Sequence, residues 1–144
     1  MYHILIPVRK DETRTRRQVN AVSDLPVRSE EVSVTVLYVF EEIDSDLGGT
    51  LSLQEYDDVP ETVTWARDAL EDEGFDVDAL VAEGHPDDAI VSLASDRDVD
   101  QIVLGGRKRS PTGKAIFGST VQSVILDADV PVTVVPEAGS EEDR

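Results

Sequence analysis

The chain has 144 residues, no cysteine, and 31 acidic against 13 basic residues, which gives a formal net charge of −18. Its length is that of one domain. The absence of cysteine excludes disulfides, cysteine-ligated zinc and a thiol nucleophile. Nucleic-acid binding needs a cationic surface, so the charge argues against it. No apolar run approaches the roughly 20 residues of a membrane helix. The first residues lack the pattern of a signal peptide, so we expect a cytoplasmic protein with no membrane partner.

The acidity has a second interpretation. Only three of the thirteen basic residues are lysines, and aspartate is abundant. Such a surface keeps a protein soluble in concentrated salt, where a Debye length of about 3 Å at 1 M screens self-repulsion. We expect a salt-adapted (halophilic) protein, with an acidic mesophilic protein as the alternative.

Five short runs rich in branched apolar residues predict strands. They are Tyr2–Val8, Val32–Phe40, Val77–Ala82, Gln101–Leu104 and Val130–Val135. Four segments with helical patterns lie between them. These are Asp11–Leu25, a segment from Pro60 to a stop at Gly74, a segment that Pro86 opens, and a segment that begins at Gly118 with Ser119 as N-cap. Strands alternating with helices of this length predict an α/β fold with a parallel sheet between two helical layers.

Two segments stand apart from this alternation. Glu41–Val59 is long and polar and contains Gly48 and Gly49, so we expect a mobile surface loop or lid. Residues 137–144 form an acidic tail that we expect to be disordered. Residues 1–136 then make up a single domain.

Positive charge is concentrated at two places. Nine of the thirteen basic residues follow the first and fourth predicted strands; they are Arg9, Lys10, Arg14, Arg16, Arg17, Arg107, Lys108, Arg109 and Lys114. Gln101–Leu126 contains no Asp or Glu. Ligands of doubly wound sheets bind outside the carboxyl ends of the strands, where strand order reverses. We predict that both clusters line one crevice that binds a small anion such as phosphate; two solvated basic loops are the alternative.

A glycine-rich segment, Gly105–Thr120, joins the fourth strand to the last helix. Glycine allows close backbone approach, and N–H groups at a helix N-terminus bind phosphate oxygens. Ser119 and Thr120 add hydroxyl groups. Six residues separate Gly106 from Gly113, and Ala115 follows Lys114, so this is not a Walker A loop. A phosphate-binding loop and an ordinary connecting loop with helix caps both remain open.

Several motifs occur in a fixed order along the chain. An ILIPV strand is followed by VTVLYVF, by Gly84-His85-Pro86 with Ile90 four residues later, by QIVLGGRKRS with FGSTVQSVI, and by VPVTVVP. With these motifs the chain resembles the universal stress protein (UspA-like) family over nearly its whole length. The nucleotide loop of that family reads Gly-x2-Gly-x9-Gly-Ser/Thr. Gly105, Gly118 and Ser119 keep its spacing, and Lys108 stands where the second glycine is expected.

The resemblance implies a three-layer flavodoxin-like or Rossmann-like fold, with an open sheet of five parallel strands in the order 3-2-1-4-5 and four helices. It also implies a homodimer formed through residues 131–135, and an exposed apolar edge strand is a ready pairing surface. Some members of the family bind ATP. For this chain ATP is therefore the expected cofactor, with Mg²⁺ or Mn²⁺ only together with the nucleotide.

The resemblance also implies a set of nucleotide-binding residues. They are Pro7, Val8, Arg9, Val39, Leu104, Gly105, Arg107, Lys108, Gly118, Ser119 and Thr120. Arg9 stands where ATP-binding members carry an aspartate that contacts the ribose. Arg9 and Lys108 both add positive charge, which leaves two hypotheses. One is a stress-response protein with a cationic nucleotide site; the other is an interaction scaffold that has lost ATP binding and takes a small anion or an acidic partner.

No catalytic set is evident. His3 is placed at the start of a strand and His85 before a helix, so we expect a binding protein rather than an enzyme. Weak ATP hydrolysis or autophosphorylation at Ser110 or Thr112 is the open alternative. Trp65 is expected to pack rather than stack on a base. The acidic runs, 57–58 and 96–100, are expected to be solvated rather than to bind a metal ion.

Overall fold

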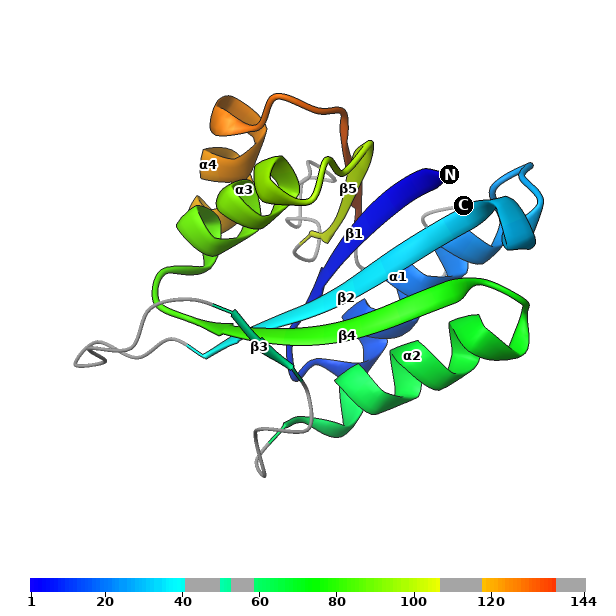
Figure 1. Cartoon of the computed structure of the whole chain (residues 1–144). Helices are drawn as coiled ribbons and strands as arrows, with labels where there is room; N and C mark the ends of the chain where they lie inside the picture. The colour runs from blue at the N-terminus through cyan, green and yellow to red at the C-terminus, as the bar shows by residue number, and fades with distance from the viewer. Residues whose placement is uncertain (41–49, 53–58, 107–117, 137–144) are drawn as a thin grey trace, which may run out of the picture.

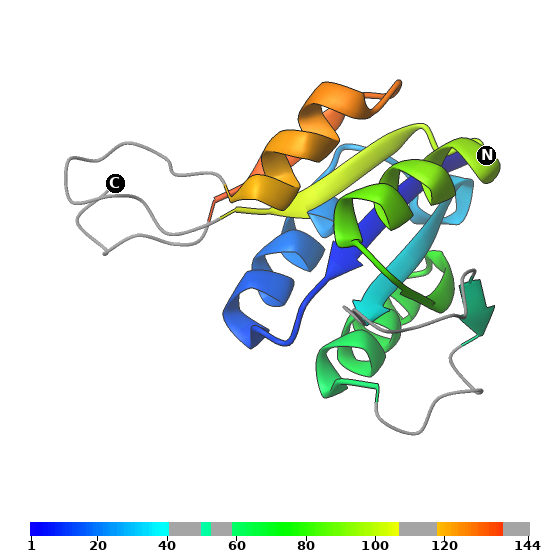
Figure 2. The same ribbon diagram turned by 90° about the vertical axis from the view of Figure 1, so that its left-hand side faces the viewer.

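The computed structural model describes residues 1–40, 50–52, 59–106 and 118–136. Its strands are β1 (Tyr2–Val8), β2 (Val32–Phe40), β3 (Thr50–Ser52), β4 (Asp76–Glu83), β5 (Gln101–Gly105) and β6 (Val132–Val135). Its helices are α1 (Glu12–Ser23), a short 3₁₀ turn at Ser29–Glu31, α2 (Glu61–Asp72), α3 (Pro86–Asp96) and α4 (Ser119–Asp127). The helices cover the sheet in two layers, α1 and α2 on one face and α3 and α4 on the other (Figures 1 and 2).

The sheet runs in the order β3-β4-β2-β1-β5-β6. The five longer strands pair in parallel, so the predicted order 3-2-1-4-5 is confirmed. β3 pairs antiparallel with β4, from Thr50↔Ala82 to Ser52↔Leu80. The prediction of a loop throughout Glu41–Val59 is therefore wrong at residues 50–52. Without β3, β4 would be a sheet edge with unpaired N–H and C=O groups. The rest of that segment except Val59, and the predicted tail 137–144, lie outside the described residues.

The central strands β1, β2 and β5 are buried on both faces. In β1, Ile4 and Ile6 pack in the cluster under α1 and α2, whereas Leu5 between them packs under α3 and α4. Successive side chains of a strand point to opposite faces, so a strand covered on both sides is apolar throughout. This explains why the ILIPV run shows no alternation of polar and apolar residues.

The helix ends follow local chemistry. Asp11 caps α1, and its carboxylate accepts a hydrogen bond from Arg14 N at 3.0 Å. Gly74, beyond the end of α2, has φ of +98° and provides the predicted stop. The prediction that Ser119 caps α4 is wrong. Gly118 is the N-cap, with an extended backbone (φ −74°, ψ 171°) and no side-chain hydrogen bond, and Ser119 is the first helical residue. None of the described helices is long and apolar enough to cross a membrane.

Val22 tests the packing of α1 on the sheet. It is fully buried, whereas Val27, in the turn after α1, is 44% exposed. We expect Val22→Ala to lower the free energy of unfolding by about 2 kcal/mol, from the lost apolar burial and the cavity left behind. Val27→Ala should change it by less than about 0.5 kcal/mol. Chemical denaturation of both variants at one salt concentration measures these changes in the free energy of unfolding. Equal losses for the two variants would contradict this packing of α1.

Candidate functional site

The site begins with a gap between two strands. β1 pairs with β2 along its whole length, but it pairs with β5 only at Ile4↔Gln101 and Leu5↔Ile102. Beyond these pairs the carboxyl ends of β1 and β5 separate. Gln18 of α1, which is fully buried, lies against the gap. Its Nε2 donates hydrogen bonds to the carbonyl oxygens of Pro7 at 2.6 Å and Val103 at 3.0 Å. One side-chain amide thus partners a backbone carbonyl from each of the two strands.

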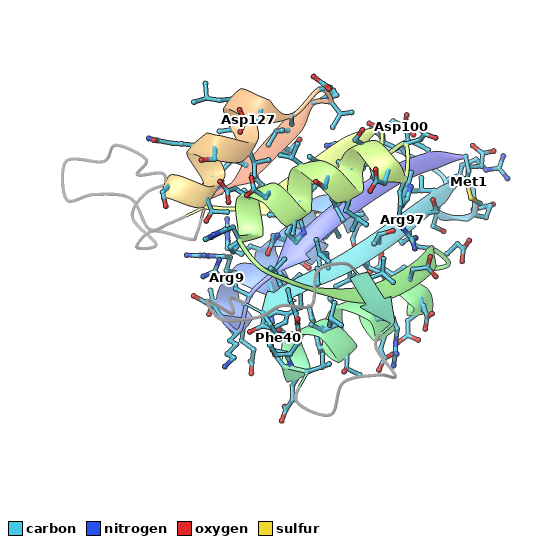
Figure 3. All side chains as sticks on the ribbon, turned by 60° about the vertical axis from the view of Figure 1, so that its left-hand side comes forward. Met1, Arg9, Phe40, Arg97, Asp100 and Asp127 are labelled. Carbon is cyan, nitrogen blue, oxygen red and sulfur yellow. The ribbon has the colours of Figure 1, made fainter. Side chains whose placement is uncertain are left out.

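A cavity of about 260 Å³ lies at this gap. It is lined by Pro7, Val8, Arg9, Arg14, Leu37, Val39, Pro86, Ile90, Leu104, Gly105, Gly118, Ser119, Thr120 and Val121. Nine of the eleven residues predicted for the nucleotide site are among them. The other two, Arg107 and Lys108, lie outside the described residues. Figure 3 shows Arg9 at the carboxyl end of β1, with Met1 and Asp100 at the opposite end of the sheet. The cavity therefore occupies the position where doubly wound sheets bind ligands.

The described lining of the cavity combines apolar and polar groups. Leu37 and Val39 of β2 and Ile90 of α3 provide branched aliphatic side chains. Ser119 and Thr120 provide hydroxyl groups at the start of α4. The first N–H groups of a helix have no acceptor within it. No side chain of the described residues caps α4, and its first turn contains no acidic residue, so these N–H groups can bind an anion.

The described lining is cationic. It contains Arg9 and Arg14 and no Asp or Glu, although the whole chain carries a net charge of −18. The backbone at Arg9 is fixed, because its carbonyl oxygen accepts hydrogen bonds from Thr62 Oγ1 at 2.7 Å and Thr15 Oγ1 at 3.3 Å. The low-dielectric walls of a cavity focus the electric field of such positive charges, and this field attracts anions.

Not every basic residue of the first cluster lines the cavity. The Arg16 guanidinium lies 5.5 Å from the centre of the Trp65 ring and 3.6 Å from the Glu12 carboxylate. Arg17 Nε donates to the carbonyl oxygen of Pro136 at 2.9 Å. The prediction that the whole cluster lines the crevice is therefore confirmed for Arg9 and Arg14 and is wrong for Lys10, Arg16 and Arg17. The second cluster, residues 107–109 and 114, lies outside the described residues.

Comparison with known proteins identifies the family. Residues 1–136 match the sequence model of the Universal stress protein family. The chain belongs to this family. A universal stress protein of Methanocaldococcus jannaschii is 35% identical over 71 residues, which are 49% of this chain and 44% of the relative, so the match spans less than half of the relative's length.

Solved structures extend the likeness over the whole fold. A universal stress protein from Archaeoglobus fulgidus superposes with a TM-score of 0.71 at 32% identity, covering 94% of this chain and 98% of that one. A universal stress protein from the same organism, in complex with dAMP, superposes with a TM-score of 0.67 at 25% identity and the same coverage. The family resemblance and the fold predicted from it are thus both confirmed.

Neither histidine of this universal stress protein is among the residues that line the cavity. His3 Nε2 is hydrogen-bonded to Thr35 Oγ1 at 2.7 Å, at the opposite end of the sheet. His85 is the N-cap of α3 and is exposed. Trp65 packs beside Arg16 in a separate hollow of about 160 Å³, so it cannot stack on a base in the cavity. Within the described part of the chain, no three His, Asp or Glu residues are grouped as a metal site.

Five lining residues are not among the eleven predicted nucleotide-binding residues, although one of them, Arg14, belongs to the basic cluster predicted to line the crevice. They are Arg14, Leu37, Pro86, Ile90 and Val121. Leu37 lies two residues before Val39 on the same strand face, so alternation could have identified it. Pro86 and Ile90 belong to the quoted family motif. No pattern in the sequence separates Arg14 from its basic neighbours. The orientation of α1 on the sheet decides which of these side chains reaches the cavity.

Gly105 tests the geometry of the cavity floor. A Cβ atom at this position would lie 2.5 Å from Arg14 Cδ. We expect Gly105→Ala to lower the free energy of unfolding by about 1–3 kcal/mol through overpacking. Most of this cost should vanish in the Arg14→Ala background, where the clashing atoms are gone. A double-mutant cycle by chemical denaturation measures the coupling, and additive costs would contradict the contact.

Proposed function

We propose that this universal stress protein binds adenine nucleotides, ATP among them, in the cavity between β1 and β5. The observation that carries the proposal is one cavity whose described lining combines branched aliphatic side chains, two arginines with no acidic residue, and an α4 N-terminus that no described side chain caps. One of the superposed A. fulgidus proteins is in complex with dAMP, which supports an adenine nucleotide as the ligand class.

Each part of the lining suits one part of the ligand. The base would pack against Leu37, Val39 and Ile90, where apolar contact replaces water. A phosphate would accept hydrogen bonds from the α4 N-terminus and from the hydroxyl groups of Ser119 and Thr120. Because no described lining residue is acidic, Mg²⁺ or Mn²⁺ would be held chiefly by phosphate oxygens. We propose a binding role rather than catalysis; Ser110 and Thr112, the candidates for autophosphorylation, lie outside the described residues.

Ser119→Asp gives a sharp test, because its effects on stability and on binding have opposite signs. A carboxylate in the first turn of α4 interacts favourably with the helix dipole, by about 0.3–1 kcal/mol. The same carboxylate would repel a phosphate, and like charges placed together cost several kcal/mol. We expect AMP and ATP to bind more than about ten-fold more weakly, with the thermal midpoint unchanged or raised. Calorimetric titration at low and at molar salt measures the affinities.

Gln122→Glu is the matched control. It adds the same charge to α4 at an exposed position outside the cavity lining, so its affinity for AMP should stay within about two-fold of the wild type once salt screens long-range charge. If the unmodified protein binds neither AMP nor ATP at either salt concentration, and purifies without nucleotide, the nucleotide proposal is wrong. The fold would then act as an interaction scaffold.

We further propose that the protein forms a homodimer through β6, the last strand of the sheet. The N–H groups of Ile102 and Gly106 bond to the carbonyl oxygens of Pro131 and Val135, so odd-numbered residues of this strand face β5. The N–H and C=O groups of Val132 and Val134 alternate with them and point away from β5. Among the described strands β6 has no neighbour on this side, and such an edge can pair with a second copy.

Val132→Pro tests this interface. Proline is tolerated on an edge strand where its missing N–H faces away from the neighbouring strand, so the folded protomer should persist while the dimer weakens. Thr133→Pro removes an N–H that faces β5, and we expect it to lower the thermal midpoint instead. Light scattering after size-exclusion chromatography gives the molar mass of the unmodified protein and of each variant. An unmodified protein with the mass of one chain, or a Val132→Pro variant that stays fully dimeric, would overturn the proposal.

A further inference from the structure

Arg14 lies across the floor of the cavity in an unusual way. Its aliphatic stem passes over Gly105 at the end of β5. A Cβ atom at that glycine would lie 2.5 Å from Arg14 Cδ and 3.1 Å from Gln18 Oε1. Residues 14 and 18 are four apart on α1, so they share one face of the helix. The absence of a side chain at Gly105 leaves room for both side chains, and Arg14 continues into the cavity lining.

Two polar atoms in this cluster lack hydrogen-bond partners. Arg14 Nε and Gln18 Oε1 are both buried, and neither makes a hydrogen bond in the described part of the chain. One atom is a donor and the other an acceptor. Buried polar groups are rarely left unpaired, and an exception calls for an explanation. Gln18 Nε2, by contrast, is fully used by the two backbone carbonyls at the gap, so the position of this amide is fixed.

We propose that Arg14 is a phosphate-binding residue of the cavity and that Gln18 positions it. The inference rests on the proposed nucleotide site and names a residue that the glycine-rich loop motif does not contain. On binding, Arg14 Nε donates to Gln18 Oε1, which satisfies both unpaired atoms. The two terminal nitrogens of the guanidinium then face the phosphate, and its planar fork suits two parallel charge-assisted hydrogen bonds. The ligand class that this arrangement selects is a nucleotide over its nucleoside.

The main experiment compares phosphate-bearing and phosphate-free ligands. AMP, adenosine and inorganic pyrophosphate are titrated by calorimetry into the full chain, as wild type and as Arg14→Gln. We expect Arg14→Gln to weaken AMP and pyrophosphate by about ten-fold to hundred-fold, the range for a charged hydrogen-bond donor. The affinity for adenosine should remain within about two-fold. Arg14→Lys keeps the charge but loses the fork, so it should recover only part of the AMP affinity.

Arg16→Gln is the matched control, because it removes the same charge from the same helix. Arg16 stacks on Trp65 and does not line the cavity, so this variant should bind AMP like the wild type. Equal weakening by Arg14→Gln and Arg16→Gln would overturn the proposal and leave only a general field effect. Nucleotide binding that Arg14→Gln leaves unchanged would overturn it while the proposed function stands. Binding of pyrophosphate that depends on Arg14, without any nucleotide binding, would overturn the proposed function and leave the role of Arg14 standing. Binding of no ligand would overturn both.

The positioning role of Gln18 needs a separate measurement, because Gln18→Leu also removes the donors at the strand gap and should lower stability. The informative quantity is the ratio of the AMP to the adenosine affinity, measured well below the thermal midpoint. A purely structural role lowers both affinities together. A positioning role lowers the ratio in the wild-type background and leaves it unchanged in Arg14→Gln. An unchanged ratio in the wild-type background would remove Gln18 from the proposal.

Discussion

The hydrogen bonds of one buried amide underlie the architecture of this site. Beyond Leu5↔Ile102, β1 and β5 separate, and a gap in a buried sheet leaves backbone carbonyls without ladder partners. Gln18 Nε2 satisfies one carbonyl from each strand. The gap can therefore stay open without leaving these two backbone carbonyls unpaired. The cavity, the approach of α1 to β5 and the position of Arg14 over Gly105 all follow from this bridge.

The second constraint is the absence of acidic residues from the described lining of the cavity. A protein with 31 acidic residues has none of them among the described residues that line the cavity. The first turn of α4 likewise contains no acid, and no side chain of the described residues caps it, whereas α3 carries Asp87 and Asp88 in its first turn. Acidic residues are favourable in a first turn because of the helix dipole. Their absence from α4 gives up that stabilisation and leaves its N–H groups available to a ligand.

The sequence was informative wherever a pattern repeats locally. Strand runs, helical spacing and the family motifs predicted the five parallel strands, the four helices and nine of the cavity-lining residues. The sequence patterns do not predict β3, because three residues are too few to show the alternation of side chains that marks a strand. Its pairing with Ala82 also joins distant parts of the chain. Ser119 was misassigned because capping preference cannot tell adjacent candidates apart, and the extended backbone of Gly118 decides the start of α4. The packing of Arg14 over Gly105 depends on the fold of α1 against β5, which no local pattern encodes.

Salt separates the roles of the two cavity arginines. At molar salt the Debye length falls to about 3 Å, so an exposed charge contributes little to the attraction of an anion, while buried charges are screened much less. Arg9 is exposed. Arg14 is half-buried and its Nε is shielded from solvent. In dilute buffer both cations strengthen the field at the cavity. In concentrated salt, recognition of the proposed phosphate group would depend on short hydrogen bonds. Arg14 and the N-terminus of α4 can provide such bonds, and their contribution should survive where that of Arg9 fades.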